Sequence, residues 1–242
     1  MSNTLDFFGG DRFRTWAFQD RYALEGEETM IDVASRFKRA LSENLYADID
    51  AYVPSFKFVP GGRILRGLGS GHKITLFNCL ALPAPGDYLL GEGSIMDTAT
   101  RLATALKRGA GVGFDVSKLR PSGSKLVSCG GNASGPVSFM KLYSDLVATI
   151  QQGGTRRGAL LMSMKADHPD IKQFIFCKNE DQQDIRFANI SVRFPGKPTG
   201  KVLNWVAEAA WNSGEPGVIF EDRINAEFGP AQMNEQFESV NA

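Results

Sequence analysis

The chain has 242 residues, enough to bury a core in one large domain or in two modest ones. Its 27 Lys and Arg residues balance its 27 Asp and Glu residues, so no overall field attracts nucleic acid or a membrane surface, and any anion site must be local. No run approaches the roughly 20 apolar residues of a membrane span, no signal peptide is recognisable, and the three cysteines match no zinc or disulfide pattern, which together predict a reduced, cytoplasmic protein.

The first part of the chain is predicted to be a small helical unit over residues 1–72. Residues 1–20 are polar and mixed in charge, and we expect residues 1–26 to form an irregular entry segment. Thr29 followed by Asp32 is a capping-box pattern, which predicts the start of a helix. The apolar residues of that helix recur at helical spacing, at Met30, Val33, Ala34, Phe37 and Leu41.

The sequence pattern changes in residues 73–242. Residues 76–82 are predicted to be a mostly buried strand that Pro83 ends. Ser94 with Asp97 predicts a helix start, and Gly109 predicts the end of that helix. A glycine-rich crossing to Phe114 is expected next.

Strands and helices continue to alternate along the rest of the chain. The further predicted elements are a helix from Pro136 to Gly153, a strand over 159–164, a helix opened by Pro169, a strand over 189–194, a helix around 202–210 and a strand over 218–220. This alternation predicts a parallel α/β arrangement rather than a sandwich or a bundle.

A run of glycines follows the first helix of this second part, as Gly109-Ala110-Gly111-Val112-Gly113. It is not a dinucleotide-binding fingerprint, because a helix and not a strand precedes it, and Phe114 stands where the third glycine belongs. Two readings stay open: a tight crossing between helix and strand, or a backbone that lies against a ligand, since glycine permits close approach.

A second glycine-containing stretch reads Gln151-Gln152-Gly153-Gly154-Thr155-Arg156-Arg157-Gly158-Ala159. Two glycines expose backbone amides, and two arginines add guanidinium groups, so the stretch is suited to face a phosphate. The alternative is a pair of surface arginines after the end of a helix.

The cysteines and histidines give no catalytic pattern by themselves. Cys79 lies in an apolar run, where an inert core thiol and a redox thiol are both possible, and Cys129 and Cys177 are read as structural. His72 and His168 are far apart and fit no metal site or catalytic triad, and His168 is read as a helix-entry residue.

Several motifs follow one another in a distinctive order. They are Pro60-Gly61-Gly62-Arg63-Ile64-Leu65, Phe77-Asn78-Cys79, Gly86-Asp87, Gly109-Ala110-Gly111-Val112-Gly113-Phe114, Leu119-Arg120-Pro121-Ser122-Gly123, Ala133-Ser134-Gly135-Pro136-Val137, Gln152-Gly153-Gly154-Thr155-Arg156-Arg157-Gly158-Ala159, His168-Pro169-Asp170-Ile171 and Ala188-Asn189-Ile190-Ser191-Val192. This order resembles the N-terminal half of a ribonucleotide reductase catalytic chain, most closely the adenosylcobalamin-dependent class II. The resemblance covers about residues 15–225, and a class I chain that depends on a radical subunit remains the alternative.

The resemblance implies a fold and a substrate site. The fold would be α/β, with a helical N-terminal unit followed by part of the ten-stranded α/β barrel. Cys79 would be one half of the disulfide that forms while the ribose is reduced. Asn78 would contact the substrate, and Gly109, Ala110 and Gly111 would pass along it.

The resemblance also implies an effector site. A deoxynucleoside triphosphate would be held by Asp87 at its sugar and by Arg120 near its phosphates. Gln152 and Arg156 would report the identity of the effector to the substrate pocket. No metal held by protein residues is expected, and adenosylcobalamin would be the cofactor, with dNTP or ATP as allosteric effectors.

The resemblance further implies partners and limits. The substrate would be a ribonucleoside di- or triphosphate, the reductant a protein of the thioredoxin or glutaredoxin type, and the assembly a homodimer. The radical cysteine and the partner of Cys79 would lie beyond Ala242, so we expect activity only together with a C-terminal part of the reductase. No region for overall on/off control by ATP and dATP is expected. A catalytically inactive nucleotide-binding fragment is the alternative.

Overall fold

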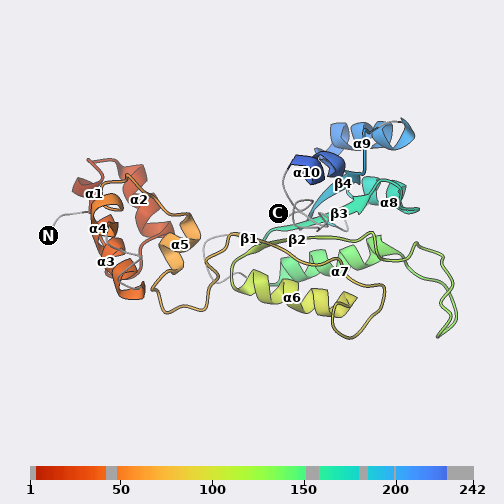
Figure 1. Ribbon diagram of the computed structural model, residues 1–242, viewed down its shortest axis with the longest axis horizontal. Helices are drawn as coiled ribbons and strands as arrows, with labels where there is room; N and C mark the ends of the chain where they lie inside the picture. Colours follow the sequence, from red (N-terminus) through yellow and green to blue (C-terminus); the bar gives the residue numbers. More distant parts are fainter. Residues whose placement is uncertain (1–3, 42–47, 151–157, 180–184, 199, 228–242) are drawn as a thin grey trace. The chain divides into compact units, whose positions relative to one another are not determined.

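A computed structural model describes residues 4–41, 48–150, 158–179, 185–198 and 200–227 (Figure 1). The chain divides into two compact units, Met1–Asn78 and Cys79–Ala242. The first unit is helical and the second is α/β. No helix among the described residues has the length and the apolar character needed to cross a bilayer.

The first unit packs short helices around a small apolar core. In its described residues these are α1 (Thr4–Phe7), α2 (Arg12–Arg21), α3 (Met30–Ala40), α4 (Ile49–Tyr52) and α5 (Gly62–Gly67). The predicted capping box is confirmed: the Thr29 side chain accepts the N–H of Ile31, and Asp32 accepts the N–H of Thr29 at 2.8 Å. Phe18, Met30, Val33 and Phe37 are among the buried side chains.

The expectation that residues 1–26 are irregular is wrong, because α1 and α2 lie within them. The Asp11 carboxylate caps α2 by accepting the N–H of Arg14 at 3.0 Å. Phe18 is the one buried side chain of α2. A helix that buries a single side chain has no apolar stripe to reveal it in the sequence.

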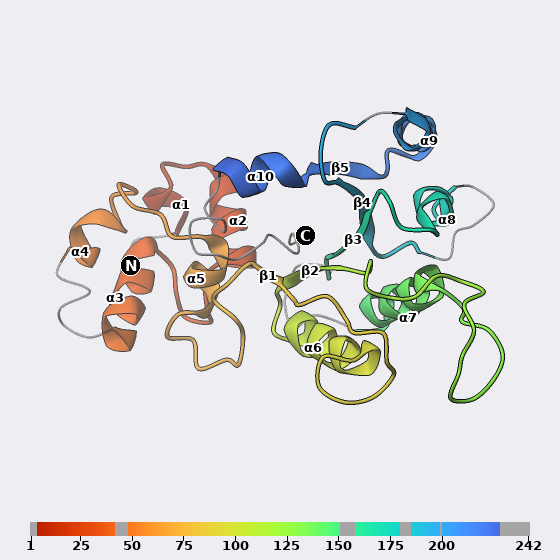
Figure 2. The same ribbon diagram turned by 45° about the vertical axis from the view of Figure 1, so that its right-hand side comes forward.

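The second unit is built on a five-stranded parallel sheet in the order β1-β2-β3-β4-β5. The strands are β1 (Cys79–Ala81), β2 (Gly111–Asp115), β3 (Leu160–Lys165), β4 (Asn189–Phe194) and β5 (Gly217–Phe220). The intervening helices are α6 (Ile95–Lys107), α7 (Pro136–Thr149), α8 (Ile171–Phe176) and α9 (Gly200–Ser213), and α10 (Glu221–Glu227) follows β5. Figure 2 shows the sheet curving, with α6, α7, α8 and α9 outside the curve. The predicted α/β arrangement is confirmed.

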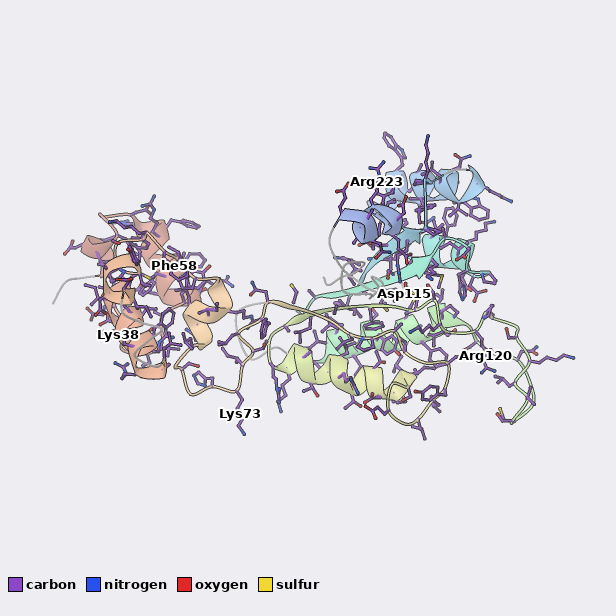
Figure 3. All side chains as sticks on the ribbon, in the orientation of Figure 1. Lys38, Phe58, Lys73, Asp115, Arg120 and Arg223 are labelled. Atoms are coloured by element: carbon purple, nitrogen blue, oxygen red, sulfur yellow. The ribbon has the colours of Figure 1, made fainter. Side chains whose placement is uncertain are left out.

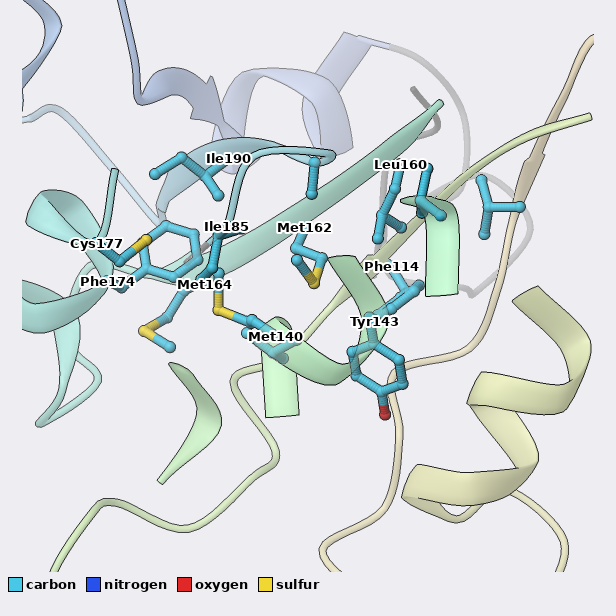
Figure 4. Close-up of a cluster of buried hydrophobic side chains, with 14 of the residues drawn as sticks. Phe114, Met140, Tyr143, Leu160, Met162, Met164, Phe174, Cys177, Ile185 and Ile190 are labelled. Atoms are coloured by element: carbon cyan, nitrogen blue, oxygen red, sulfur yellow. The ribbon is translucent and has the colours of Figure 1, made fainter. Parts of the chain in front are cut away.

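The core of this unit fills the space between the sheet and these helices (Figure 4). The strand register places Phe114, Met162 and Ile190 side by side on the helix-facing side of the sheet. The ring of Phe114 meets the ring of Tyr143 edge-on, with centroids 5.0 Å apart. Tyr143 donates its hydroxyl to the carbonyl oxygen of Ile95 at 3.0 Å, which ties α7 to α6, and burial raises the pKa of Tyr143.

Two further predictions about local structure are corrected. The strand predicted over 76–82 is the three-residue β1 and is not mostly buried; Phe77, just before it, is 71% exposed. The glycine-rich stretch that ends at Phe114 is not a crossing but β2, every residue of which is buried. Glycines lower strand propensity, and only pairing with two neighbouring strands makes this segment extended.

Candidate functional site

Cys79 lies on the face of the sheet opposite to the helices. It is in register with Gly111, and Ala81 is in register with Gly113, so these positions share one side of β1 and β2. The Cys79 side chain is partly buried, and the two glycines are buried and present no side chain. Cys79 therefore lies beside two positions that carry no side chain.

The other predicted substrate residues differ in their surroundings. Gly109 and Ala110 lie just after α6: their N–H groups donate to the carbonyl oxygens of Leu106 at 2.8 Å and Ala105 at 3.0 Å. Gly109 has a φ of +87°, which explains the glycine there, and Ala110 is fully buried. Asn78 is exposed and is the last residue of the first unit, so only Gly111 is brought beside Cys79 by strand pairing.

The predicted effector residues Asp87 and Arg120 form an ion pair with each other. Asp87 follows β1, and Arg120 follows β2, so both lie past the carboxyl ends of adjacent parallel strands. The Arg120 backbone N–H donates to Asp87 Oδ1 at 3.2 Å, Nε donates to Oδ2, and Nη2 donates to the Asp87 carbonyl oxygen at 3.4 Å. The side chains are 39% and 30% exposed. The carboxyl ends of parallel strands are where α/β proteins bind ligands.

Gln152 and Arg156, the predicted reporters of the effector, lie outside the described residues. The described chain on either side of them is anchored. The Ile150 N–H donates to the carbonyl oxygen of Leu146 at 2.9 Å, and the Ala159 carbonyl oxygen accepts the N–H of Val112 at 2.9 Å. Val112 lies next to Gly111 in β2, so residue 159, just before β3, lies close to the strand that pairs with Cys79.

A buried charge cluster lies on the same face of the sheet as Cys79. Asp115, Ser163 and Arg193 are each at most 3% exposed. Arg193 pairs with Asp115 at 3.0 Å and with Glu221 at 2.8 Å, and the Ser163 hydroxyl donates to Asp115 at 2.9 Å. In Figure 3, Asp115 lies at the sheet, whereas Arg120 lies at the base of a loop that projects from it.

Neither this cluster nor the hydrogen bond made by His168 was predicted from the sequence. Ser191 and Arg193 alternate with the apolar residues of β4, which is a sign that the second face of the strand is polar. His168 is buried, and its ring forms a hydrogen bond with the carbonyl oxygen of Leu119. No local sequence pattern predicts this hydrogen bond.

The remaining cysteines contrast with Cys79. Cys177 belongs to the core on the helix side of the sheet, and burial raises the pKa of its thiol to about 12. Cys129 is exposed. Among the described residues, no group of three or more His, Cys, Asp or Glu side chains is placed to hold a metal ion.

A family model and several curated relatives match this chain. Residues 78–198 match the family model described as "Ribonucleotide reductase, barrel domain". A vitamin B12-dependent ribonucleoside-diphosphate reductase from Mycobacterium tuberculosis is 31% identical over 196 residues, which cover 71% of this chain and 28% of the relative. One from Thermoplasma acidophilum is 33% identical over 213 residues, which cover 77% of this chain and 27% of the relative.

A solved structure shares the fold. The class Id ribonucleotide reductase alpha subunit of Actinobacillus ureae superposes with a TM-score of 0.75 and 19% identity, covering 96% of this chain and 44% of the subunit. The match confirms the predicted fold class, part of the barrel with the helical region before it. The chain spans between a quarter and a third of the length of the two curated relatives named above.

Proposed function

Because this chain belongs to the ribonucleotide reductase family, we propose that it supplies a redox thiol and an effector site to a vitamin B12-dependent ribonucleotide reductase. The reductase would convert ribonucleotides to deoxyribonucleotides in the cytoplasm, together with a polypeptide that completes the barrel. One observation carries this proposal: Cys79 is in register with Gly111 on the side of the curved sheet opposite to α6, α7, α8 and α9.

We propose that Cys79 supplies one of the two thiols, and so one of the two electrons, that reduce the ribose. Removing one hydroxyl from a ribose consumes two thiols: the C–O bond is replaced by C–H, the oxygen leaves as water, and the two sulfurs form a disulfide. Cys177 is a poor second thiol, because it is buried on the helix side of the sheet with a raised pKa. We assign the second thiol to the rest of the protein, with a thioredoxin- or glutaredoxin-type protein or dithiol to reduce the disulfide again.

The residues around Cys79 would orient the substrate. The bare backbone at Gly111 lets the ribose approach the sulfur, and Asn78, the residue before Cys79, offers an amide to the sugar. Gly109 and Ala110 would act through the turn that leads into β2.

The effector in this proposal is a deoxynucleoside triphosphate or ATP at Asp87 and Arg120. A guanidinium suits phosphate oxygens, and a carboxylate accepts from a sugar hydroxyl. Gln152 and Arg156 would pass the identity of the base towards the substrate, since residue 159 is anchored to β2 beside Gly111. A second copy of the chain is the proposed partner in a dimer.

Adenosylcobalamin, when bound, would supply the radical that starts the reduction. The names of the curated relatives favour this cofactor over a separate radical subunit.

A nucleotide-binding fragment without catalysis is the second candidate function. It is favoured by the fact that Asp87 and Arg120, and the segments that hold them, all lie within this chain. Such a fragment would bind effector nucleotides whether or not the barrel is completed.

Reconstitution separates the two candidates. The chain is combined with the remaining barrel polypeptide of a vitamin B12-dependent reductase, adenosylcobalamin, dithiothreitol and each ribonucleoside di- or triphosphate, and deoxyribonucleotide is quantified. We expect product from the mixture and none from either polypeptide alone. Nucleotide binding without product in any mixture would leave only the second candidate.

A further inference from the structure

The segment that carries Arg120 is held by side chains from other loops rather than by regular structure. Residues 119–122 follow β2 and belong to no helix or strand. The Arg120 N–H donates to Asp87, Pro121 has no N–H, and the Ser122 N–H donates to Asp170 Oδ2 at 2.8 Å. Every backbone donor of residues 120–122 is therefore accepted by a carboxylate from a different loop.

His168 forms a hydrogen bond with Leu119, the first residue of this segment. Its Nδ1 accepts the N–H of Asp170 at 3.0 Å, so the ring proton must lie on Nε2. Nε2 is 3.0 Å from the carbonyl oxygen of Leu119 and donates to it. His168 is 8% exposed and Leu119 is 2% exposed, so this hydrogen bond is shielded from water.

Two backbone features restrict the segment further. Arg120 precedes Pro121, which disfavours the helical conformation and favours an extended backbone at Arg120. Gly135, at the start of α7, has a φ of +82°, and a Cβ there would stand 2.8 Å from Asp170 Oδ2 and 2.9 Å from the Ser122 nitrogen. The bond between Asp170 and Ser122 thus crosses a space that only glycine leaves open.

We propose that His168 and Asp170 are positioning residues that hold Arg120 in place for the effector. They bind the backbone on both sides of Arg120, at Leu119 and Ser122, and so join the loop after β3 to the loop after β2. Asp87 then meets Arg120 from the loop after β1. This inference rests on the proposed effector site, and it adds two residues that touch no nucleotide themselves.

The test is the affinity of the 242-residue chain for dATP, dGTP, dTTP and dCTP, each measured by equilibrium dialysis. We expect His168→Ala and Asp170→Ala to raise Kd about tenfold, because the loss of one hydrogen-bond partner of a fixed backbone group has roughly that free-energy cost. His168→Gln keeps an amide donor for Leu119, and Asp170→Asn keeps an oxygen acceptor for Ser122, so both should recover most of the affinity.

Two controls separate positioning from a general loss of structure. Asp167→Ala removes an exposed carboxylate from the same loop and should leave Kd unchanged. In an Arg120→Ala background, His168→Ala should weaken binding no further, since it acts only through Arg120. The bond between Asp170 and Ser122 is exposed, so Asp170→Ala should stay folded even if His168→Ala does not.

The binding results separate a failure of the positioning role from a failure of the proposed effector site. If Arg120→Ala weakens binding while folded His168→Ala and Asp170→Ala bind like the wild-type chain, the positioning role is refuted and the effector site stands. If the wild-type chain binds none of the four nucleotides, the effector site is refuted, and the positioning role is refuted with it.

Discussion

Asp115 and Arg193 form a buried ion pair across β3, although their strands β2 and β4 are not neighbours; the Oδ2–Nη1 distance is 3.0 Å. Ser163 of β3 donates to the same carboxylate oxygen, and Glu221 of α10 accepts from the other end of the guanidinium. The cluster therefore joins three strands and the helix after β5 on the face opposite to the helix-packed core. Its charges stabilise the fold only as a complete set, because a buried charge without its partner is costly.

Removing the cation should reveal this dependence. Arg193→Ala leaves the carboxylates of Asp115 and Glu221 without their shared partner, and we expect it to lower the free energy of unfolding by roughly 3–5 kcal/mol. Urea unfolding followed by circular dichroism measures the change. Lys165→Ala, which removes an exposed cation from the neighbouring strand, should change it by no more than about 0.5 kcal/mol. Equal effects of the two substitutions would show that the cluster stabilises the fold no more than a single exposed cation does.

Two glycines with similar φ differ in what surrounds them. Gly123 and Gly135 both have a φ near +80°, at +81° and +82°, but a Cβ at Gly123 would meet nothing within 4 Å. Gly123→Ala should therefore cost only the left-handed conformation, about 1–2 kcal/mol. Gly135→Ala should cost clearly more, because the backbone at φ +82° and ψ 169° suits glycine almost alone and because Asp170 and Ser122 would have to move apart. Thermal unfolding of both variants tests this, and a smaller cost at Gly135 would contradict the described contact.

The capping box of α3 predicts a dependence of stability on pH. Burial raises the pKa of the Asp32 carboxyl, but hydrogen bonds from the N–H groups of Thr29 and Glu28 and from the Thr29 hydroxyl outweigh it, so its pKa is lowered. A carboxyl whose folded pKa is lowered contributes stability above its unfolded pKa, about 3.9, and loses it as pH falls through the folded pKa.

The matching measurement is unfolding in urea between pH 6 and pH 2. The wild-type chain should lose more stability below about pH 4 than Asp32→Asn, which has no carboxyl to protonate at this position. Thr29→Ala should reduce the difference, since it removes one of the hydrogen bonds that lower the pKa. Parallel pH profiles for the wild-type chain and Asp32→Asn would contradict the assigned shift.

The three thiols should differ in their reaction with iodoacetamide. Cys129 is exposed and should be alkylated first, and Cys79, which is partly buried, more slowly. Cys177 should stay unmodified at pH 8 until the chain unfolds, because burial raises its pKa to about 12 and closes access. Mass spectrometry of peptides after timed alkylation gives the order. Early modification of Cys177 would show that the core around it opens.

Much of the second unit was predictable from local signals. Ser94 caps α6 by accepting the N–H of Asp97, and Pro136 stands at the first position of α7, as expected from the sequence. The strand expected over 189–194 is β4 with the same bounds. These elements were found because capping residues and apolar periodicity act over a few neighbouring residues.

What the sequence did not reveal depends on pairing between distant segments. β2 is extended because β1 and β3 flank it, not because Gly111 and Gly113 favour a strand. The bond from His168 to Leu119 and the ion pair of Asp115 with Arg193 depend on strand order and register. The family resemblance suggested Asp87 and Arg120 as residues of one site, but not that they bind each other.

The central claim is that Cys79 supplies one of the two thiols that reduce the ribose. The most direct measurement is the number of deoxyribonucleotides formed per reconstituted enzyme, with adenosylcobalamin and dithiothreitol, for the wild-type chain, Cys79→Ser, Cys129→Ser and Cys177→Ser. Serine is close in size to cysteine but cannot form a disulfide, so Cys79→Ser should abolish multiple turnover while Cys129→Ser and Cys177→Ser continue to turn over. Sustained turnover by Cys79→Ser at the wild-type rate would contradict the claim and leave Cys79 as a packing residue at the edge of the sheet.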